Sequence, residues 1–162
     1  MVLDIVTYPD ARLRRSTIAV DEITDEIRAL VLDMTDTMYA RDGVGLAAPQ
    51  VGRVERIFVL ASDILPPGDY GVFINPEIVA SRRETEAAVE GCLSFPGVAL
   101  RIPRATGVKV RATNLEGIQF ELECEGFLAR AVQHEYDHLD GKLFLDLVSA
   151  IKRQAVTKKL RG

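Results

Sequence analysis

Apolar residues recur every three or four positions between Asp21 and Arg41, which places them on one face of a helix. The members of this stripe are Ile23, Ile27, Leu30, Val31, Met34 and Met38. Acidic residues at positions 21 and 22 suit the positive end of a helix, and Gly43 follows just past its last turn. The pattern predicts a helix over 21–41, followed by a glycine-punctuated loop or irregular strand over 43–50.

Two further helices are predicted in the C-terminal part of the chain. Gly126 and Gly141 bracket the segment 127–140, and glycines in such places commonly mark the boundaries of a helix. Ser149 is a suitable N-cap for a last helix over 149–160.

Alternation of apolar and charged residues predicts a β-hairpin around a turn at 114–117. Its apolar members are Val108 and Val110 before the turn and Phe120, Leu122 and Cys124 after it. The charged residues between them leave one face of the hairpin wet. Short apolar runs over 56–60, 72–74 and 78–80 predict further strands, whereas Arg82, Arg83, Glu84 and Glu86 indicate a solvated strand–loop edge.

Length and composition are typical of one globular domain. The chain has 162 residues, of which 48% are hydrophobic and 27% charged, and this composition excludes a disordered or fibrous protein. Helices interspersed with hairpin strands indicate an α+β fold. We expect a single domain over 1–162, in which antiparallel or mixed β-sheets pack around the helix 127–140, with an N-terminal and a C-terminal helix.

The charge balance and the N-terminal segment exclude several classes of protein. The net charge is −4, which is not typical of proteins that coat nucleic acid. No apolar run approaches the roughly 18 residues that a membrane span needs. Charged residues from Asp4 to Arg15 interrupt the region where a secretory signal would have its apolar core. We therefore expect no membrane partner and a cytoplasmic location.

The predicted helix 127–140 contains an H-E-x-x-H segment, from His134 to His138. Residues four apart share one helical face, so both imidazoles can reach one metal ion. Glu135 lies where it can act as a base toward a water on that ion. These are the only two histidines in the chain, although a charged helix face that holds two histidines by chance is an alternative.

A third protein ligand would complete a catalytic metal site with an open position. In one group of peptidases a third histidine follows the segment, but Phe144 occupies that position here. Cys124 is in phase with the apolar residues of its strand and is expected to be a buried hydrophobic residue. Cys92 lies among glycines and a proline, which favour close approach of the backbone to a site. The candidate ligands are therefore Cys92, His134 and His138.

A thiolate ligand lowers the net charge of a divalent site, so further donors are needed where negative charge develops in a reaction. The side chain of Gln50 and the backbone N–H of Leu93, next to Cys92, are candidates. Spacing along the chain leaves open whether either one reaches the site.

Three motifs stand in order along the chain: 43–50 (GVGLAAPQ), 90–94 (EGCLS) and 133–139 (QHEYDHL). In this order and spacing the chain resembles the peptide deformylases over essentially its whole length. The resemblance implies an enzyme that removes the formyl group from the N-terminal formyl-methionine of newly synthesised bacterial or organellar proteins. It also implies one divalent metal ion, Fe²⁺ in the cell, which Ni²⁺, Co²⁺ or Zn²⁺ can replace.

The resemblance assigns roles to individual residues. It implies metal ligation by Cys92, His134 and His138, acid–base catalysis by Glu135, and hydrogen bonding to the substrate peptide by the backbone of Gly45. The side chain of Gln50 and the N–H of Leu93 become the expected oxyanion donors.

A pocket for the methionine side chain is expected beside the metal ligands. Ala131 and Phe127 precede His134 by three and seven residues and share its helical face, and Val44 comes from the glycine-rich loop. The alternative is that Phe127 and Ala131 belong to the core.

The segment from Ser149 onward is basic and has no acidic residue; its charges are Lys152, Arg153, Lys158, Lys159 and Arg161. The resemblance implies that this helix contacts the ribosome, and a solvated helix end is the alternative.

Two other functions remain open from the residues alone. One is a metallopeptidase that uses the same helix, and the other is a non-catalytic module with a structural metal and an RNA-binding tail.

Overall fold

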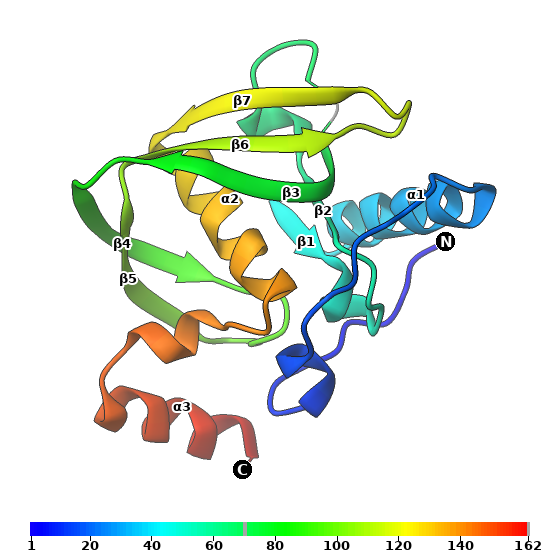
Figure 1. The fold of residues 1–162 in the computed structure, drawn as a ribbon. Helices are drawn as coiled ribbons and strands as arrows, with labels where there is room; N and C mark the ends of the chain where they lie inside the picture. Colours follow the sequence, from blue (N-terminus) through cyan, green and yellow to red (C-terminus); the bar gives the residue numbers. More distant parts are fainter. Residues whose placement is uncertain (70, 162) are drawn as a thin grey trace.

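The first helix begins where a side chain caps it. A computed structural model describes residues 1–69 and 71–161, and its first helix, α1, spans Asp25–Ala40 (Figure 1). The hydroxyl of Thr24 accepts a hydrogen bond from the N–H of Ile27, so the helix starts after the expected position 21. The stripe of apolar residues predicted for this helix packs against a cluster with Leu46 and Ile57.

Five antiparallel strands form the larger sheet. In spatial order they are β1 (Gly45–Ala47), β2 (Ile57–Leu60), β3 (Val72–Ser81), β6 (Gly107–Thr113) and β7 (Gln119–Glu125). The predicted hairpin is confirmed, because Val108 pairs with Cys124 and Val110 with Leu122. The expected loop over 43–50 contains β1 at the sheet edge, followed by a 3-10 turn over Ala48–Val51.

The two strand pieces expected at 72–74 and 78–80 are one continuous strand with an irregularity between them. Asn75 adopts a left-handed backbone conformation (φ 52°), and the register with β6 shifts between Ile74 and Glu77. The side chain of Asn75 exchanges two hydrogen bonds of 2.8 Å with the backbone N–H and C=O of Val20. These bonds explain why the strand tolerates the unusual conformation.

A second, two-stranded sheet consists of β4 (Thr85–Gly91) and β5 (Ala99–Ala105). The solvated edge expected around 82–86 comprises the connection before β4 and the first residues of that strand, and β5 has no counterpart among the predicted strands. Pro103 lies inside β5 and obscures its strand character in the sequence, although a proline is acceptable in an edge strand. The two sheets lie on either side of helix α2 (Gly126–Leu139), as Figure 1 shows.

Both C-terminal helices have the expected extents within two residues. Helix α2 is followed by Gly141, whose φ of 73° and close approach to the carbonyl of Arg14 leave no room for a side chain. After a 3-10 turn over Phe144–Leu147, helix α3 spans Ala150–Arg161. The hydroxyl of Ser149 accepts a hydrogen bond from the N–H of Lys152, as expected of its N-cap.

The core has three clusters of buried side chains, which lie between α2 and the large sheet, beneath α1, and beneath α3. Phe58 and Phe73 stack in the first cluster with their ring centroids 4.6 Å apart. Cys124 is buried in the same cluster, as its place in the alternating pattern predicts. In the described ranges, no helix combines the length and apolar character that crossing a membrane would require.

Candidate metal centre and active site

Helix α2 and the loop after β4 bring three ligand-type side chains together. His134 and His138 lie one turn apart on α2, and Cys92 directly follows β4. One donor atom from each of the three lies within 4.8 Å of the other two. The Sγ of Cys92 is 3.4 Å from Nε2 of His138. The structure therefore assembles the three residues that the sequence singled out as ligands.

Glu90 orients the first of the two imidazoles. Its Oε1 lies 2.8 Å from Nδ1 of His134, and hydrogen bonding to a carboxylate assigns the proton to Nδ1. The other ring nitrogen of His134 is then free to bind a metal ion. Such a carboxylate partner is a common support for a metal-binding histidine.

Two arginines hold the Glu90 carboxylate in place. Arg104 of β5 donates to both of its oxygens at 2.9 and 3.0 Å, and Arg130 of α2 donates to Oε2 at 2.7 Å. Arg104 also donates to Asp137 at 2.7 Å. Burial opposes the charge on Glu90, but the hydrogen bonds from Arg104 and His134 outweigh it and lower the pKa of Glu90 to about 2. The carboxylate is therefore ionised at neutral pH.

The donor set suits one divalent transition-metal ion with an open coordination position. One thiolate and two imidazole nitrogens are three ligands, the number typical of catalytic rather than structural zinc-type sites. The one other thiol in the chain that could close such a site is Cys124. That thiol lies in the core cluster of the large sheet, and burial raises its pKa to about 12, which disfavours the thiolate.

Glu135 is a buried carboxylate next to this site. Among the described residues, its Oε1 has no hydrogen-bond partner. Burial raises the pKa of Glu135 to about 7. Its Oε2 lies so close to Gly45 that a β-carbon on that glycine would stand 2.6 Å away. Glycine at position 45 thus lets the backbone of β1 approach the carboxylate.

Gln50 also points at the ligand group. Its Oε1 accepts from the N–H of Ala47 at 3.0 Å, which fixes the orientation of the side-chain amide. Its Nε2 donates to the hydroxyl of Ser94 at 3.1 Å and lies 3.5 Å from Sγ of Cys92. An amide donor therefore lies beside the sulfur of the candidate ligand Cys92.

A cavity of about 730 Å³ opens onto these groups. Its walls contain nearly all the residues that the sequence proposed for the site, namely Val44, Gly45, Gln50, Cys92, Leu93, Phe127, Ala131, His134 and Glu135. The tenth, His138, is buried with 1% of its surface exposed. Arg130 and the loop residues Phe95 to Val98 also line the cavity, and none of them was among the candidate site residues.

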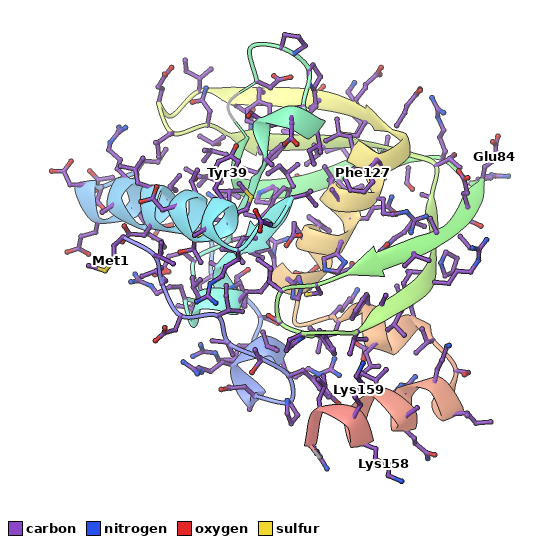
Figure 2. All side chains as sticks on the ribbon, turned by 180° about the vertical axis from the view of Figure 1, so that it is seen from behind. Met1, Tyr39, Glu84, Phe127, Lys158 and Lys159 are labelled. Carbon is purple, nitrogen blue, oxygen red and sulfur yellow. The ribbon has the colours of Figure 1, made fainter. Side chains whose placement is uncertain are left out.

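The expected pocket residues lie at different depths. Ala131 is 6% exposed and belongs both to the core and to the cavity wall. Phe127 is 56% exposed on the first turn of α2 (Figure 2), so the alternative that it belongs to the core is wrong. Val44 is likewise exposed at the cavity.

Sequence reasoning gave no role to Glu90, Arg104 or Arg130. Glu90 belongs to the same short motif as Cys92, two residues before it, and this was the only signal that pointed to it. The arginines carry no such signal, because their role depends on the pairing of β4 with β5 and on the packing of α2.

The substitution Glu90→Gln is predicted to weaken both the fold and the metal site. It leaves two buried arginines without their shared counter-charge, which costs about 3–5 kcal/mol of the free energy of unfolding. It also removes the carboxylate from His134, and we expect metal affinity to fall about 10- to 100-fold. Urea unfolding and Zn²⁺ competition with a chelator measure the two effects.

The matched control for this prediction is Glu121→Gln, which removes an exposed carboxylate paired with Lys109 and Arg111. We expect it to change neither quantity, because exposed ion pairs contribute little. Equal behaviour of the two variants would contradict the prediction.

Comparison with known proteins identifies the family. The family model described as polypeptide deformylase matches residues 2–154. A peptide deformylase of Acinetobacter baumannii (strain SDF) is 48% identical over 160 residues, which cover 98% of this chain and 90% of that protein. Peptide deformylase 1 of Burkholderia multivorans (strain ATCC 17616 / 249) is 44% identical over 161 residues, 99% of this chain and 88% of that protein.

Solved structures agree with the sequence relatives. The crystal structure of a peptide deformylase from Legionella pneumophila has a TM-score of 0.91 at 41% identity, and the match covers 99% of this chain and 94% of that chain. A peptide deformylase from Ehrlichia chaffeensis in complex with actinonin also has a TM-score of 0.91 at 41% identity, with 99% and 96% covered. The chain therefore belongs to the peptide deformylase family, the metal-dependent hydrolases that remove the formyl group from an N-terminal methionine.

Proposed function

We propose that residues 1–162 form one catalytic domain that hydrolyses the N-formyl group of formyl-methionine on newly synthesised proteins. Hydrolysis of the formamide C–N bond by water gives formate and a free amino terminus. The observation that carries this proposal is the convergence of Cys92, His134 and His138 beside the buried carboxylate of Glu135 at one cavity. We further propose the bacterial cytoplasm as its place of action, because its relatives include bacterial deformylases.

Cys92, His134 and His138 would hold one divalent ion, which supplies a Lewis acid and an activated water when it is bound. We propose Fe²⁺ in the cell, with Ni²⁺, Co²⁺ or Zn²⁺ able to replace it. A thiolate with two imidazoles accepts several first-row ions, which supports this range. Glu90 keeps the ring of His134 oriented for binding.

Glu135 would move the protons of the reaction. It takes a proton from the attacking water and later delivers it to the leaving amine, so the carboxyl group ends in its starting state. A pKa of about 7, raised by burial, suits a group that must both accept and donate near neutral pH. Because Oε1 has no partner among the described residues, that oxygen is available to the reacting water.

Gln50 and Leu93 would stabilise the negative charge that develops on the formyl oxygen. The side-chain amide of Gln50 lies beside Sγ of Cys92 and can present its Nε2 to that oxygen. The backbone N–H of Leu93 follows the thiolate ligand directly and belongs to a residue of the cavity wall. Together they would supply one side-chain and one backbone donor.

The substrate peptide would lie along β1. This strand is at the edge of the five-stranded sheet, and within the part of the chain that the structure describes it pairs with β2 alone, so its other edge can bind an extended chain. Gly45 lies on this strand and lines the cavity, which supports a backbone hydrogen bond to the substrate. Ala131 at depth, with Phe127 and Val44 nearer the surface, would form the apolar pocket for methionine.

We predict that Glu135→Gln abolishes formate release from a formyl-Met-Ala-Ser peptide. The amide keeps the shape of the side chain but cannot accept the proton of water. Enzyme prepared without oxygen and reloaded with Fe²⁺ or Ni²⁺ provides the reference. Bound metal is measured in parallel and should be unchanged, so a variant that releases formate at the parent rate would overturn the role of Glu135.

We predict that Gln50→Ala keeps its metal and loses turnover by about 10²–10³ in kcat, the usual effect of removing one oxyanion donor. Steady-state formate release measures kcat, and metal analysis shows whether the site is intact. Ser94→Ala is the comparison variant, because it removes the hydroxyl that accepts from the Gln50 amide and leaves the amide itself in place. Near-normal turnover of metal-loaded Gln50→Ala would refute the assignment.

We also propose that the basic face of α3 contacts the ribosome. Figure 2 shows Lys158 on the side of α3 away from the rest of the molecule, where it is free to meet phosphate groups. Its neighbours Arg153 and Arg161 line the same shallow groove. The positive charge stands out in a chain with net charge −4.

Lys158→Glu is predicted to reduce co-sedimentation with ribosomes severalfold at low salt and to leave formate release unchanged. The control is Arg83→Glu, the same change of charge at an exposed position outside α3. Electrostatic contact with RNA makes pelleting of the parent fall steeply with added salt. If Lys158→Glu and the parent pellet equally, α3 has no such role.

A further inference from the structure

Phe144 occupies the position where some H-E-x-x-H enzymes have a third histidine, and its ring contacts a metal ligand. The residue lies at the start of the 3-10 turn after α2 and is 2% exposed. Its ring stands edge-on to the imidazole of His134, with centroids 5.5 Å apart and an angle of 72° between the planes. No part of the catalytic scheme above uses this contact.

The contact is one end of a column of aromatic rings. Phe144 meets Phe95 edge-on at 4.9 Å, and Phe95 stacks on Tyr8 at 4.9 Å. The hydroxyl of Tyr8 is 3.2 Å from that of Thr157, on helix α3. The column thus runs from a metal ligand to the C-terminal helix.

The same column reaches the thiolate ligand through the backbone. The N–H of Phe95 donates to the carbonyl of Cys92 at 2.9 Å, which closes the turn that carries the ligand. The N–H of Tyr8 donates to the carbonyl of Ser94 at 2.8 Å. The residues of the column therefore contact both segments that carry candidate ligands: the ring of Phe144 meets His134, and the backbone N–H groups of Phe95 and Tyr8 bond to the turn after β4.

The hydrogen bond that His134 donates to Glu90 fixes one atom of its ring, Nδ1, and the imidazole of His138 meets the same ring edge-on with centroids 5.1 Å apart. A single bond to Nδ1 leaves the ring able to tilt about that bond, and the ring contacts from His138 and Phe144 restrict the tilt. Aromatic pairs at these separations have preferred edge-to-face arrangements, so they restrain orientation as well as filling space. Restraint of a ligand ring raises metal affinity, because less motion is lost when the ion binds.

We propose that Phe144 is a positioning residue for His134, and that Phe95 and Tyr8 extend its support to α3. The proposal rests on the assignment of His134 as a metal ligand. In some H-E-x-x-H enzymes the residue at the position of Phe144 binds the metal itself. Here Phe144 would instead hold the imidazole ring of His134 in place.

The test compares Phe144→Leu with Phe73→Leu in the full chain. Phe73 is a matched control because it is 1% exposed and has two aromatic neighbours, Phe58 and Phe120, neither of which is a candidate ligand. Zn²⁺ affinity is measured by competition with a chromogenic chelator without oxygen, and urea unfolding is followed in excess chelator. Both variants should lose stability, but only Phe144→Leu should lose Zn²⁺ affinity, by about tenfold.

Equal Zn²⁺ affinities in the two variants would overturn the proposal, whether both fall or neither does. His134→Ala separates this result from failure of the proposed function: if it binds Zn²⁺ as tightly as the parent, His134 is not a ligand and both ideas are wrong. Tyr8→Leu provides a second arm, because the side chain of Tyr8 is only half-buried. It should weaken Zn²⁺ binding measurably, and Tyr8→Phe, which keeps the stacked ring, should restore it; unchanged affinity in Tyr8→Leu would remove Tyr8 from the column.

Discussion

The carboxylate of Glu90 is the contact on which the arrangement of the site depends. Each of its oxygens accepts two hydrogen bonds: Oε1 from Arg104 and His134, and Oε2 from Arg104 and Arg130. These partners come from β5 and α2, so one side chain of β4 joins the smaller sheet to the ligand helix. With Asp137 on Arg104, the buried cluster contains two acidic and two basic groups, and its formal charge is balanced. Because every charge in the cluster is paired, most of the free-energy cost of burying these charges is offset. Removal of any one charged side chain leaves its partners buried without a counter-charge, which destabilises the fold.

Glu135 is also a buried glutamate, but its hydrogen bonding and its pKa differ from those of Glu90. Glu90 is buried with every lone pair used, and its pKa falls to about 2. Glu135 is buried with one oxygen that has no partner among residues 1–69 and 71–161, and its pKa rises to about 7. The environment thus separates a permanently charged support from a group that can exchange protons, as in other enzymes with paired carboxylates. The close approach of Gly45 to Glu135 places the edge of β1 beside this second carboxylate.

Helix α3 has two different surfaces. Its inner surface packs Val156 beside Phe95 and Phe144, and Lys159 donates to the carbonyl of Gly97 at 2.7 Å, in the loop that lines the cavity. Its outer surface carries Lys158, which points away from the molecule (Figure 2). The C-terminal helix is therefore packed against the wall of the cavity and is also a source of positive charge. A partner that binds the outer surface of α3 would therefore contact a helix whose inner surface packs against the residues that line the cavity.

The sequence by itself determined the features that follow from local spacing. The period of 3.6 residues predicted α1, the glycines at 126 and 141 predicted α2, and the N-cap residue Ser149 predicted α3. The period of two predicted the hairpin of β6 and β7, and the i, i+4 rule placed His134 and His138 on one face. The tertiary structure alone decided which distant residues meet. Glu90 and Arg130 are 40 positions apart, and Phe144 is far along the chain from Phe95 and Tyr8. No periodicity relates such residues, because their contact depends on how two sheets pack around one helix. That packing also exposed Phe127 at the cavity mouth, since only its surroundings determine whether an apolar residue becomes core or binding surface.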